Sequence, residues 1–371
     1  MPRQTATVTA TASVSWDPFL DSLQLRTLNF FLETTDPNTG LTPDRWPSPS
    51  PSSIAAVGFA LTSYAIAVER ELITREEAAQ RTLKTLRFFW QLPQHDQPQN
   101  VGGYKGFFYH FLKIPNGTRE WNCELSTIDT ALLMAGVLFA QSYFDADNTN
   151  ENDIRNLADS LYFRIDWKWA MADTNGVKTS WRPEQGFGKY IWDGYDEAMM
   201  LYILALGSPA HPVPESVWQV WTKPYVWAKY YDQEFVSFGP LFGHQYSHGW
   251  IDSRNIQDDY MRNRGITYFE NSRRAARAYC IANPRRWVGY GENVWGITAC
   301  DGPNGYAARG APPTQNDDGT IAPTAAANSI PFTPKESLAA LRYMYDTYYS
   351  KIWMKYSGRQ RIGWRRAHCC V

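Results

Sequence analysis

Residues 125–144, LSTIDTALLMAGVLFAQSYF, are predicted to form a long buried helix because apolar side chains dominate the segment. Apolar residues recur at helical spacing elsewhere, between loops rich in Gly, Trp, Tyr and His. The other predicted helices cover residues 18–34, 54–71, 75–90, 154–169, 195–206, 214–231, 256–281 and 334–353. Because helix follows helix without a compositional boundary, we expect a single all-α domain, an α/α toroid in which helix hairpins surround an axis. A helical array and two separate bundles are the alternatives.

The composition excludes several classes of function. The chain has 371 residues, of which 44% are hydrophobic, and a formal net charge of -1. It can therefore bury a core, and it lacks the positive charge that attracts nucleic acids. No apolar run approaches the roughly 20 residues that a membrane span needs. The five Cys are scattered without a CxxC pair, so we expect free thiols rather than disulfides or a zinc site.

Two acidic clusters precede apolar helices. Glu124 and Asp129 stand at the start of the first helix quoted above, where Glu124 is expected in the first turn. Helix capping by Glu124 and a salt bridge of Asp129 are the structural alternatives. In residues 190–209, YIWDGYDEAMMLYILALGSP, the acids Asp193, Asp196 and Glu197 alternate with aromatic residues. Burial and neighbouring carboxylates would raise the pKa of Glu197, as a general acid requires; complementing the helix dipole is the alternative.

Two Gly-rich loops carry further polar and aromatic residues. Residues 238–255 contain His244, Tyr246, His248, Trp250, Asp252 and Arg254. Two His at this spacing could bind a metal, but no third ligand pattern accompanies them, so hydrogen bonding to a polyhydroxyl ligand is the better interpretation. The long segment 289–331 lacks a helical pattern and is expected to be a folded functional loop. It contains Glu292, Trp295 and Asp301, for which an ordered surface loop is the alternative.

Together, these loops place Trp or Tyr beside Asp or Glu. Sugar rings offer apolar faces for stacking and hydroxyl edges for hydrogen bonds, and the chain is 15% aromatic, with 16 Trp and 22 Tyr. Glycoside hydrolysis needs a protonated carboxyl group and a second carboxylate. No P-loop, GxGxxG fingerprint or GxSxG elbow supports another chemistry.

At these residues the chain resembles the glucoamylase-like domain family, which includes bacterial endo-β-1,2-glucanases. The matching segments are CELSTIDTALLMAG, IWDGYDEAMMLYILALGSP, GPLFGHQYSHGWID, ENVWGITACDGPNGY and DDGTIAPTAAANSIPFTPKESLAALRYMYD, within residues 17–353. The resemblance implies an (α/α)6 toroid and an inverting hydrolase of β-1,2-linked or related glucan that needs no metal or other cofactor. It implies that Glu197 is the acid and that Glu124 and Asp129 line the reaction centre. The implied substrate-binding residues are Trp121, Trp192, Tyr195, Tyr246, His248, Trp250, Arg254, Glu292, Trp295 and Asp301.

The ends of the chain differ from this domain. We expect a flexible leader over residues 1–15, a catalytic toroid over 16–353 and an atypical basic tail over 354–371, where family members continue with another loop and helix. The toroid is therefore expected to be incomplete at its C-terminus. The alternatives are a glycosidase of the same fold acting on another α- or β-glucan, a catalytically impaired glucan-binding relative, and a partner-binding helical scaffold. Family members are exported, although no signal peptide is visible here; a monomer that binds an oligo- or polysaccharide is expected.

Overall fold

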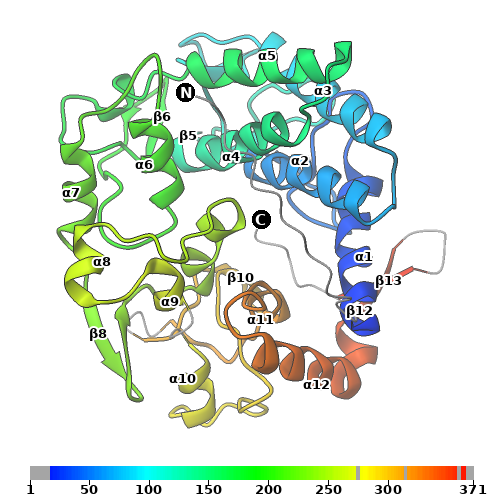
Figure 1. Cartoon of the computed structure of the whole chain (residues 1–371), viewed down its shortest axis with the longest axis vertical. Coiled ribbons are helices and arrows are strands. Elements are labelled where there is room, and N and C mark those ends of the chain that lie inside the picture. The colour runs from blue at the N-terminus through cyan, green and yellow to red at the C-terminus, as the bar shows by residue number, and fades with distance from the viewer. Residues whose placement is uncertain (1–16, 273–275, 313–315, 357–360, 365–371) are drawn as a thin grey trace.

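The computed structural model describes residues 17–272, 276–312, 316–356 and 361–364. Figure 1 shows the helices following one another around a ring, from α1 through α4, α6 and α8 to α12. The helices are α1 (Pro18–Thr34), α2 (Ile54–Glu69), α3 (Arg75–Gln91), α4 (Thr127–Tyr143), α5 (Thr149–Phe163), α6 (Met199–Leu206), α7 (Ser216–Thr222), α8 (Asp259–Arg264), α9 (Tyr268–Ser272), α10 (Arg277–Ala282), α11 (Pro323–Asn328) and α12 (Pro334–Ile352). The fold is helix-rich, as the sequence predicts.

Short strands lie in the loops, where the sequence predicts none. Each pairs antiparallel with a neighbour in a sheet of two or three strands. They are β1 (Ser52–Ser53), β2 (Gly103–Tyr104), β3 (Phe107–Phe108), β4 (Phe111–Leu112), β5 (Leu125–Ser126), β6 (Ser180–Arg182), β7 (Gly186–Phe187), β8 (Trp227–Tyr230), β9 (Gln233–Val236), β10 (Cys300–Gly302), β11 (Gly305–Ala307), β12 (Trp353–Tyr356) and β13 (Arg361–Trp364). Three of these strands, β5, β6 and β11, contribute residues to the site described below.

The long predicted helices are confirmed where capping residues agree with the apolar pattern. Asp17 caps α1 by accepting a hydrogen bond from the Phe19 amide, and Thr74 caps α3 by accepting one from the Glu77 amide. Such caps satisfy amides that the first turn leaves without a partner. The ends of the predicted helices therefore agree with the structure to within a few residues for α1, α2, α3 and α12.

Two predicted helices are wrong over much of their length. The prediction for 214–231 holds only for α7, because residues 227–236 turn back as the β8–β9 hairpin. The prediction for 256–281 is replaced by the three short helices α8, α9 and α10. Gly265 ends α8 in the left-handed conformation at φ 68°, which terminates a helix readily. In both segments, turns interrupt the helix that the local sequence predicts.

Five of the helices, α2 to α6, form an inner and an outer layer. α2, α4 and α6 lie on the inner side and pack consecutively against one another, whereas α3 and α5 pack together outside them (Figure 1). α2 and α4 approach especially closely at Gly58 and Gly136. A Cβ added to Gly136 would lie 2.1 Å from the carbonyl oxygen of Gly58, so neither position has room for a side chain. This contact sets the close approach between α2 and α4, the helix that carries Asp129.

The first and last long helices meet and close the ring. Asp17 pairs with Arg342 of α12 at 2.5 Å, and the ring of Phe19 packs edge-on against Tyr345 at 5.3 Å. Leu23 of α1 is buried in the same apolar cluster as Leu341. These contacts join elements that lie more than 300 residues apart in the sequence.

Three cysteines in the described part of the chain, Cys123, Cys280 and Cys300, are buried free thiols, as expected. Among the described residues, no helix is both long enough and apolar enough to cross a lipid bilayer.

Candidate active site

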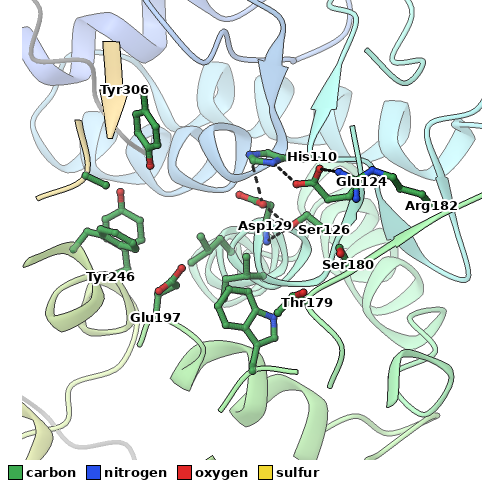
Figure 2. Close-up of a pocket in the computed structure, with 15 residues that line it drawn as sticks. His110, Glu124, Ser126, Asp129, Thr179, Ser180, Arg182, Glu197, Tyr246 and Tyr306 are labelled. Carbon is green, nitrogen blue, oxygen red and sulfur yellow. Dashed lines mark hydrogen bonds and ion pairs between the residues drawn. The ribbon is translucent and has the colours of Figure 1, made fainter. Parts of the chain in front are cut away.

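A cavity of about 490 Å³ opens on the inner side of the ring (Figure 2). Its wall combines three carboxylates with one histidine, one arginine and several aromatic rings. The lining residues are His110, Glu124, Ser126, Ile128, Asp129, Leu132, Thr179, Ser180, Arg182, Trp192, Glu197, Phe242, Tyr246, Ala299 and Tyr306. The structure thus brings together Glu124, Asp129 and Glu197, which come from two distant segments of the chain.

Glu197 lies in the turn immediately before α6, with its side chain pointing into the cavity (Figure 2). The apolar residues that follow it, Met199 and Met200, are buried in the core, so the carboxyl group lies at the inner edge of a dry region. Burial raises the pKa of Glu197 to about 7, and the charge of Asp129 adds to this effect. Glu197 can therefore hold a proton near neutral pH and donate it.

Asp129 lies in the first turn of α4 and also faces the cavity. The N-cap residue Ser126 accepts a hydrogen bond from the Asp129 amide at 3.2 Å, and its hydroxyl donates to Asp129 Oδ2 at 2.5 Å. One carboxylate oxygen is thereby tied to the helix terminus, while the side chain remains 14% exposed to the cavity. Asp129 is thus both part of the helix cap and available to a ligand.

Glu124 precedes β5 rather than lying in the first turn of α4, so this part of the sequence prediction is wrong. It is held by two cations instead of by the helix. Oε1 lies 2.9 Å from His110 Nδ1, and Oε2 accepts a hydrogen bond from Arg182 at 2.9 Å. The hydrogen bond with His110 lowers the pKa of Glu124 to about 2, with a further contribution from Arg182. Glu124 is therefore ionised throughout the physiological range.

His110 and Arg182 are site residues that the sequence analysis does not single out. His110 lies between β3 and β4, and its Nε2 is 3.7 Å from Asp129 Oδ2. Burial alone would lower the pKa of His110, but Asp129 and Glu124 outweigh it and raise the pKa to about 9. Arg182 comes from β6, which pairs with β5 and so places the guanidinium beside Glu124. Neither residue belongs to a recognisable motif.

Aromatic side chains form the remaining wall. Trp192 donates its indole N–H to Thr127 at 3.0 Å and presents its ring to the cavity. Tyr246 and Tyr306 lie on the side of the cavity opposite His110, with their hydroxyl groups facing each other (Figure 2). Tyr306 is carried by the β10–β11 hairpin and is 55% exposed. Flat rings beside polar groups suit a sugar, whose faces are apolar and whose edges carry hydroxyls.

Two other predicted substrate-binding residues lie beside the cavity lining. Trp121 is 64% exposed and packs edge-on against Phe111, the neighbour of His110. Asp301 pairs with Arg45 at 3.0 Å and lies opposite Tyr306 in the β10–β11 hairpin. Both therefore lie next to residues that adjoin or line the cavity, but neither lines it.

The other predicted binding residues lie elsewhere. Tyr195 is buried against Tyr268, His248 is half-buried between Ser253 and Ser272, and the indole of Trp250 donates to Thr62. Trp295 is 2% exposed and belongs to the core cluster shared by α1 and α12. Arg254 pairs with Asp252, and the 77% exposed Glu292 pairs with Arg277. None of these six side chains lines the cavity.

The two acids near Glu197 in the sequence, Asp193 and Asp196, do not line the cavity. Asp193 is exposed. Asp196 is buried and accepts hydrogen bonds from the Ala198 amide at 2.9 Å and the Trp221 indole at 3.2 Å. Burial and the neighbouring Glu197 raise the pKa of Asp196 well above its usual value. Its bonds hold the turn that aims Glu197 at the cavity.

The described residues include no group of three or more His, Cys, Asp or Glu side chains arranged to hold a metal ion. His244 and His248, the pair considered as ligands from the sequence, make other contacts. His244 Nε2 lies 3.0 Å from the Phe238 carbonyl oxygen, and the two ring nitrogens of His248 face Ser253 and Ser272.

Known proteins resemble this chain in sequence and fold. The family model "Glycoamylase: Putative glucoamylase" matches residues 189–366, a range that extends into the segment predicted as a tail. The exo β-1,2-glucooligosaccharide sophorohydrolase (non-reducing end) of Parabacteroides distasonis is 30% identical over 395 residues, which cover 95% of this chain. The match covers 52% of that protein, so the chain spans about half the length of this curated relative.

Two solved structures are similar over most of their length. A "putative glucoamylase" from Bacteroides caccae is 30% identical, with a TM-score of 0.78; the match covers 89% of this chain and 83% of that one. An endo-β-1,2-glucanase from Chitinophaga pinensis, solved with sophorotriose and glucose, is 25% identical, with a TM-score of 0.81. That match covers 96% of this chain and 89% of the glucanase.

Proposed function

Since the chain belongs to the glucoamylase-like family, we propose that it is a glycoside hydrolase that cleaves β-1,2-linked glucan with inversion of the anomeric centre. The observation that carries the proposal is that the carboxyl groups in the cavity differ in how strongly they hold a proton. Glu197 holds a proton up to a pH of about 7, and the charge of Asp129, which contributes to this raised pKa, faces the same cavity. An inverting glycosidase needs one protonated carboxyl group and one carboxylate facing the same bond. The names of the two β-1,2-glucan-cleaving relatives support this linkage.

In the proposed reaction, Glu197 donates its proton to the glycosidic oxygen as the bond to the anomeric carbon breaks. A water molecule attacks that carbon from the opposite face and gives its proton to Asp129. We assign the base to Asp129 because its charge acts directly on Glu197 and one of its oxygens is fixed by Ser126. Glu124 is the weaker candidate, since two cations lower its affinity for a proton. The cycle ends when the proton on Asp129 exchanges through solvent and Glu197 is protonated again.

The glucan is proposed to lie between two aromatic walls. Trp192 provides one ring, and Tyr246 and Tyr306 provide the opposite side. The exposed Trp121 would extend the cleft beyond Glu124, and its backbone lies in the left-handed region at φ 50°, a conformation that L-residues rarely adopt. Strain that holds an exposed indole in place is typical of a binding surface. The buried members of the predicted set, Tyr195 and Trp295, are proposed to act through packing.

The fold is proposed to be the (α/α)6 toroid that the resemblance implies. The inner layer α2, α4 and α6, the outer layer α3 and α5, and the contact between α1 and α12 support this type. In such a toroid the N-terminal ends of inner helices can converge on a central cavity. α4 and α6 carry Asp129 and Glu197 at their N-terminal ends in this way.

The experiment that tests the function is a panel of linear glucans. Purified protein is incubated with β-1,2-glucan, β-1,3-glucan and an α-1,4-glucan, reducing ends are measured, and the first-formed anomer is read by NMR. Release from β-1,2-glucan with an α-anomeric product supports the proposal. Release from another glucan would assign the chain to a different glycosidase of this fold. Binding of β-1,2-glucan without release would instead identify a glucan-binding relative.

A further inference from the structure

We infer that His110 is a positioning residue whose imidazolium, bridging Glu124 and Asp129, holds the Asp129 carboxylate as the base that faces the cavity with Glu197. The inference rests on the proposed function for its kinetic consequence alone. The charge state of His110 itself can be measured whether or not the protein cleaves a glucan.

The first support is geometry. His110 Nδ1 lies 2.9 Å from Glu124 Oε1, and Nε2 lies 3.7 Å from Asp129 Oδ2, so each ring nitrogen faces a different carboxylate (Figure 2). Nδ1 is within hydrogen-bond distance of Glu124, whereas the 3.7 Å contact of Nε2 with Asp129 is an ion pair, so negative charge lies on both sides of the ring. The bridge therefore favours the charged form of the ring.

The second support is the way the backbone holds this ring. The His110 amide donates to the Glu124 carbonyl oxygen at 2.9 Å, and the Ile54 amide donates to the His110 carbonyl oxygen at 3.2 Å. The imidazole also stacks on Phe111, with ring centroids 3.9 Å apart and planes inclined by 16°. His110 is thus fixed to the segment that carries Glu124 and to the start of α2. A ring placed so firmly can hold a carboxylate in one orientation.

The third support is the charge balance around the ring. Four elements bring charged groups toward it: the loop before β1 brings Asp44, the segment before β5 brings Glu124, α4 brings Asp129, and β6 brings Arg182. Arg182 and His110 both contact Glu124, but Asp129 has only His110 as a cation within 4 Å among the ion pairs of the described residues. Burial opposes the charge on His110, and the carboxylates outweigh it, which raises the pKa of His110 to about 9.

Removing the cation should shift protons among the carboxyls. Without it, Glu124 and Asp129 face each other with Arg182 as the remaining partner, and mutual repulsion favours protonation of Asp129. A protonated Asp129 cannot accept a proton from water. The acidic limb of the pH–rate profile, where the base gains its proton, is therefore expected to move toward higher pH.

The test compares His110→Gln with His110→Lys, which retains a positive charge, and with His211→Gln. His211 is a suitable control because it also faces a carboxylate, that of Asp166 at 3.9 Å, but does not line the cavity. We expect His110→Gln to move the acidic limb of the pH–rate profile up by about one pH unit and to lower kcat at pH 6 at least tenfold. His110→Lys should move this limb back toward its wild-type position, and His211→Gln should leave it unchanged. An unshifted profile in folded His110→Gln would overturn the inference.

A second measurement does not depend on catalysis. The histidine ring resonances of the ligand-free wild type are titrated by NMR, with the His110 signal assigned by its absence in His110→Gln or, if that variant does not fold, by its shift in Glu124→Gln. We expect a charged ring at pH 7.5 and a lower pKa of His110 in Glu124→Gln. A neutral ring at pH 7.5 would refute the inference. A charged His110 ring in a protein that cleaves no glucan would refute the proposed function but would still support the bridge between Glu124 and Asp129.

Discussion

Asp129 and Glu197 face one cavity from the N-terminal ends of the adjacent helices α4 and α6, and the charge of Asp129 raises the pKa of Glu197. Each acid lies where a loop leads into an apolar helix. The helix anchors the backbone in the core, while the carboxyl group reaches the cavity. The pair sets a proton donor against a proton acceptor across a space that a sugar ring could occupy.

Replacing Glu197 by Gln should abolish most of the hydrolysis. Gln has nearly the same shape but cannot donate a proton, so the rate on β-1,2-glucan should fall about 10²–10⁴-fold while binding is retained. Reducing-end release and calorimetric titration measure the two quantities. The exposed Glu215, which lies away from the cavity, gives the matched control Glu215→Gln, which should retain the wild-type rate. Equal rates for all three proteins would refute the assignment of the acid.

Activity should decline as the pH rises through about 7, because the acid must be protonated and the pKa of Glu197 lies near that value. The same shift affects stability. Since the folded-state pKa of Glu197 lies above the unfolded value of about 4.3, its contribution is complete below that value and is lost as the pH rises through about 7. Urea unfolding should thus show Glu197→Gln gaining roughly 1–3 kcal/mol relative to wild type between pH 5 and pH 8. A constant difference across this range would contradict the predicted pKa.

Stability should also fall between about pH 6.5 and pH 4. Burial lowers the pKa of His244 and of His248 to about 4, so both are neutral in the fold and must take up protons on acidification. Their contribution is complete above the unfolded pKa of about 6.5 and is lost as the pH falls toward 4, at roughly 1–3 kcal/mol for each ring. Denaturant unfolding at pH 7, 5.5 and 4.5 measures the loss. His248→Gln should reduce its pH dependence, whereas His211→Gln, at a partly exposed ring, should not.

Substituting Ala for Gly136 should destabilise the protein, although Ala normally stabilises a helix interior by about 1 kcal/mol relative to Gly. The added methyl group would lie 2.1 Å from the Gly58 carbonyl oxygen, so α2 and α4 must separate, at a cost of about 1–3 kcal/mol. Because α4 carries Asp129, kcat should fall as well. Gly249→Ala is the control, since a Cβ there meets nothing within 4 Å. Thermal melts and initial rates check both effects, and a stabilised Gly136→Ala would contradict the close approach.

Asp317 should prove essential to the folded loop that follows α10. This 4% exposed carboxylate accepts hydrogen bonds from the side chains of Tyr279, Trp287 and Tyr290 and from the Gly319 amide. Asp317→Ala leaves these donors without their acceptor and should cost about 3 kcal/mol or more. The highly exposed Asp259 offers the comparison Asp259→Ala, expected to change stability by less than about 0.5 kcal/mol. Urea unfolding and limited proteolysis of residues 289–320 measure the effect.

The sequence predicts the helices best where apolar periodicity and capping agree, as in α3 with Thr74 and Glu77. It fails in residues 256–281, where Gly265 and the surrounding turns override a weak helical pattern. Strands of two to four residues cannot be read from local sequence, because their partners are distant along the chain. Domain limits and a monomeric state stay predictions.

For the site, the sequence identifies acids that precede apolar helices, and Glu197 and Asp129 belong to this class. It does not identify His110 or Arg182, because each acquires its role only from a carboxylate that the fold brings beside it. Aromatic residues are the least predictable group. Trp192 and Tyr246 line the cavity, whereas Tyr195 and Trp295 lie in the core, and the same residue types serve both purposes.

The contact between α1 and α12 has a consequence for biosynthesis. Phe19 packs against Tyr345 of a helix that leaves the ribosome after more than 300 further residues, and Leu23 shares an apolar cluster with Leu341 of the same helix. Until then the nascent chain carries an unmatched apolar stripe on its first helix, which a chaperone could cover. Closure of the ring is therefore expected to be among the last events after translation.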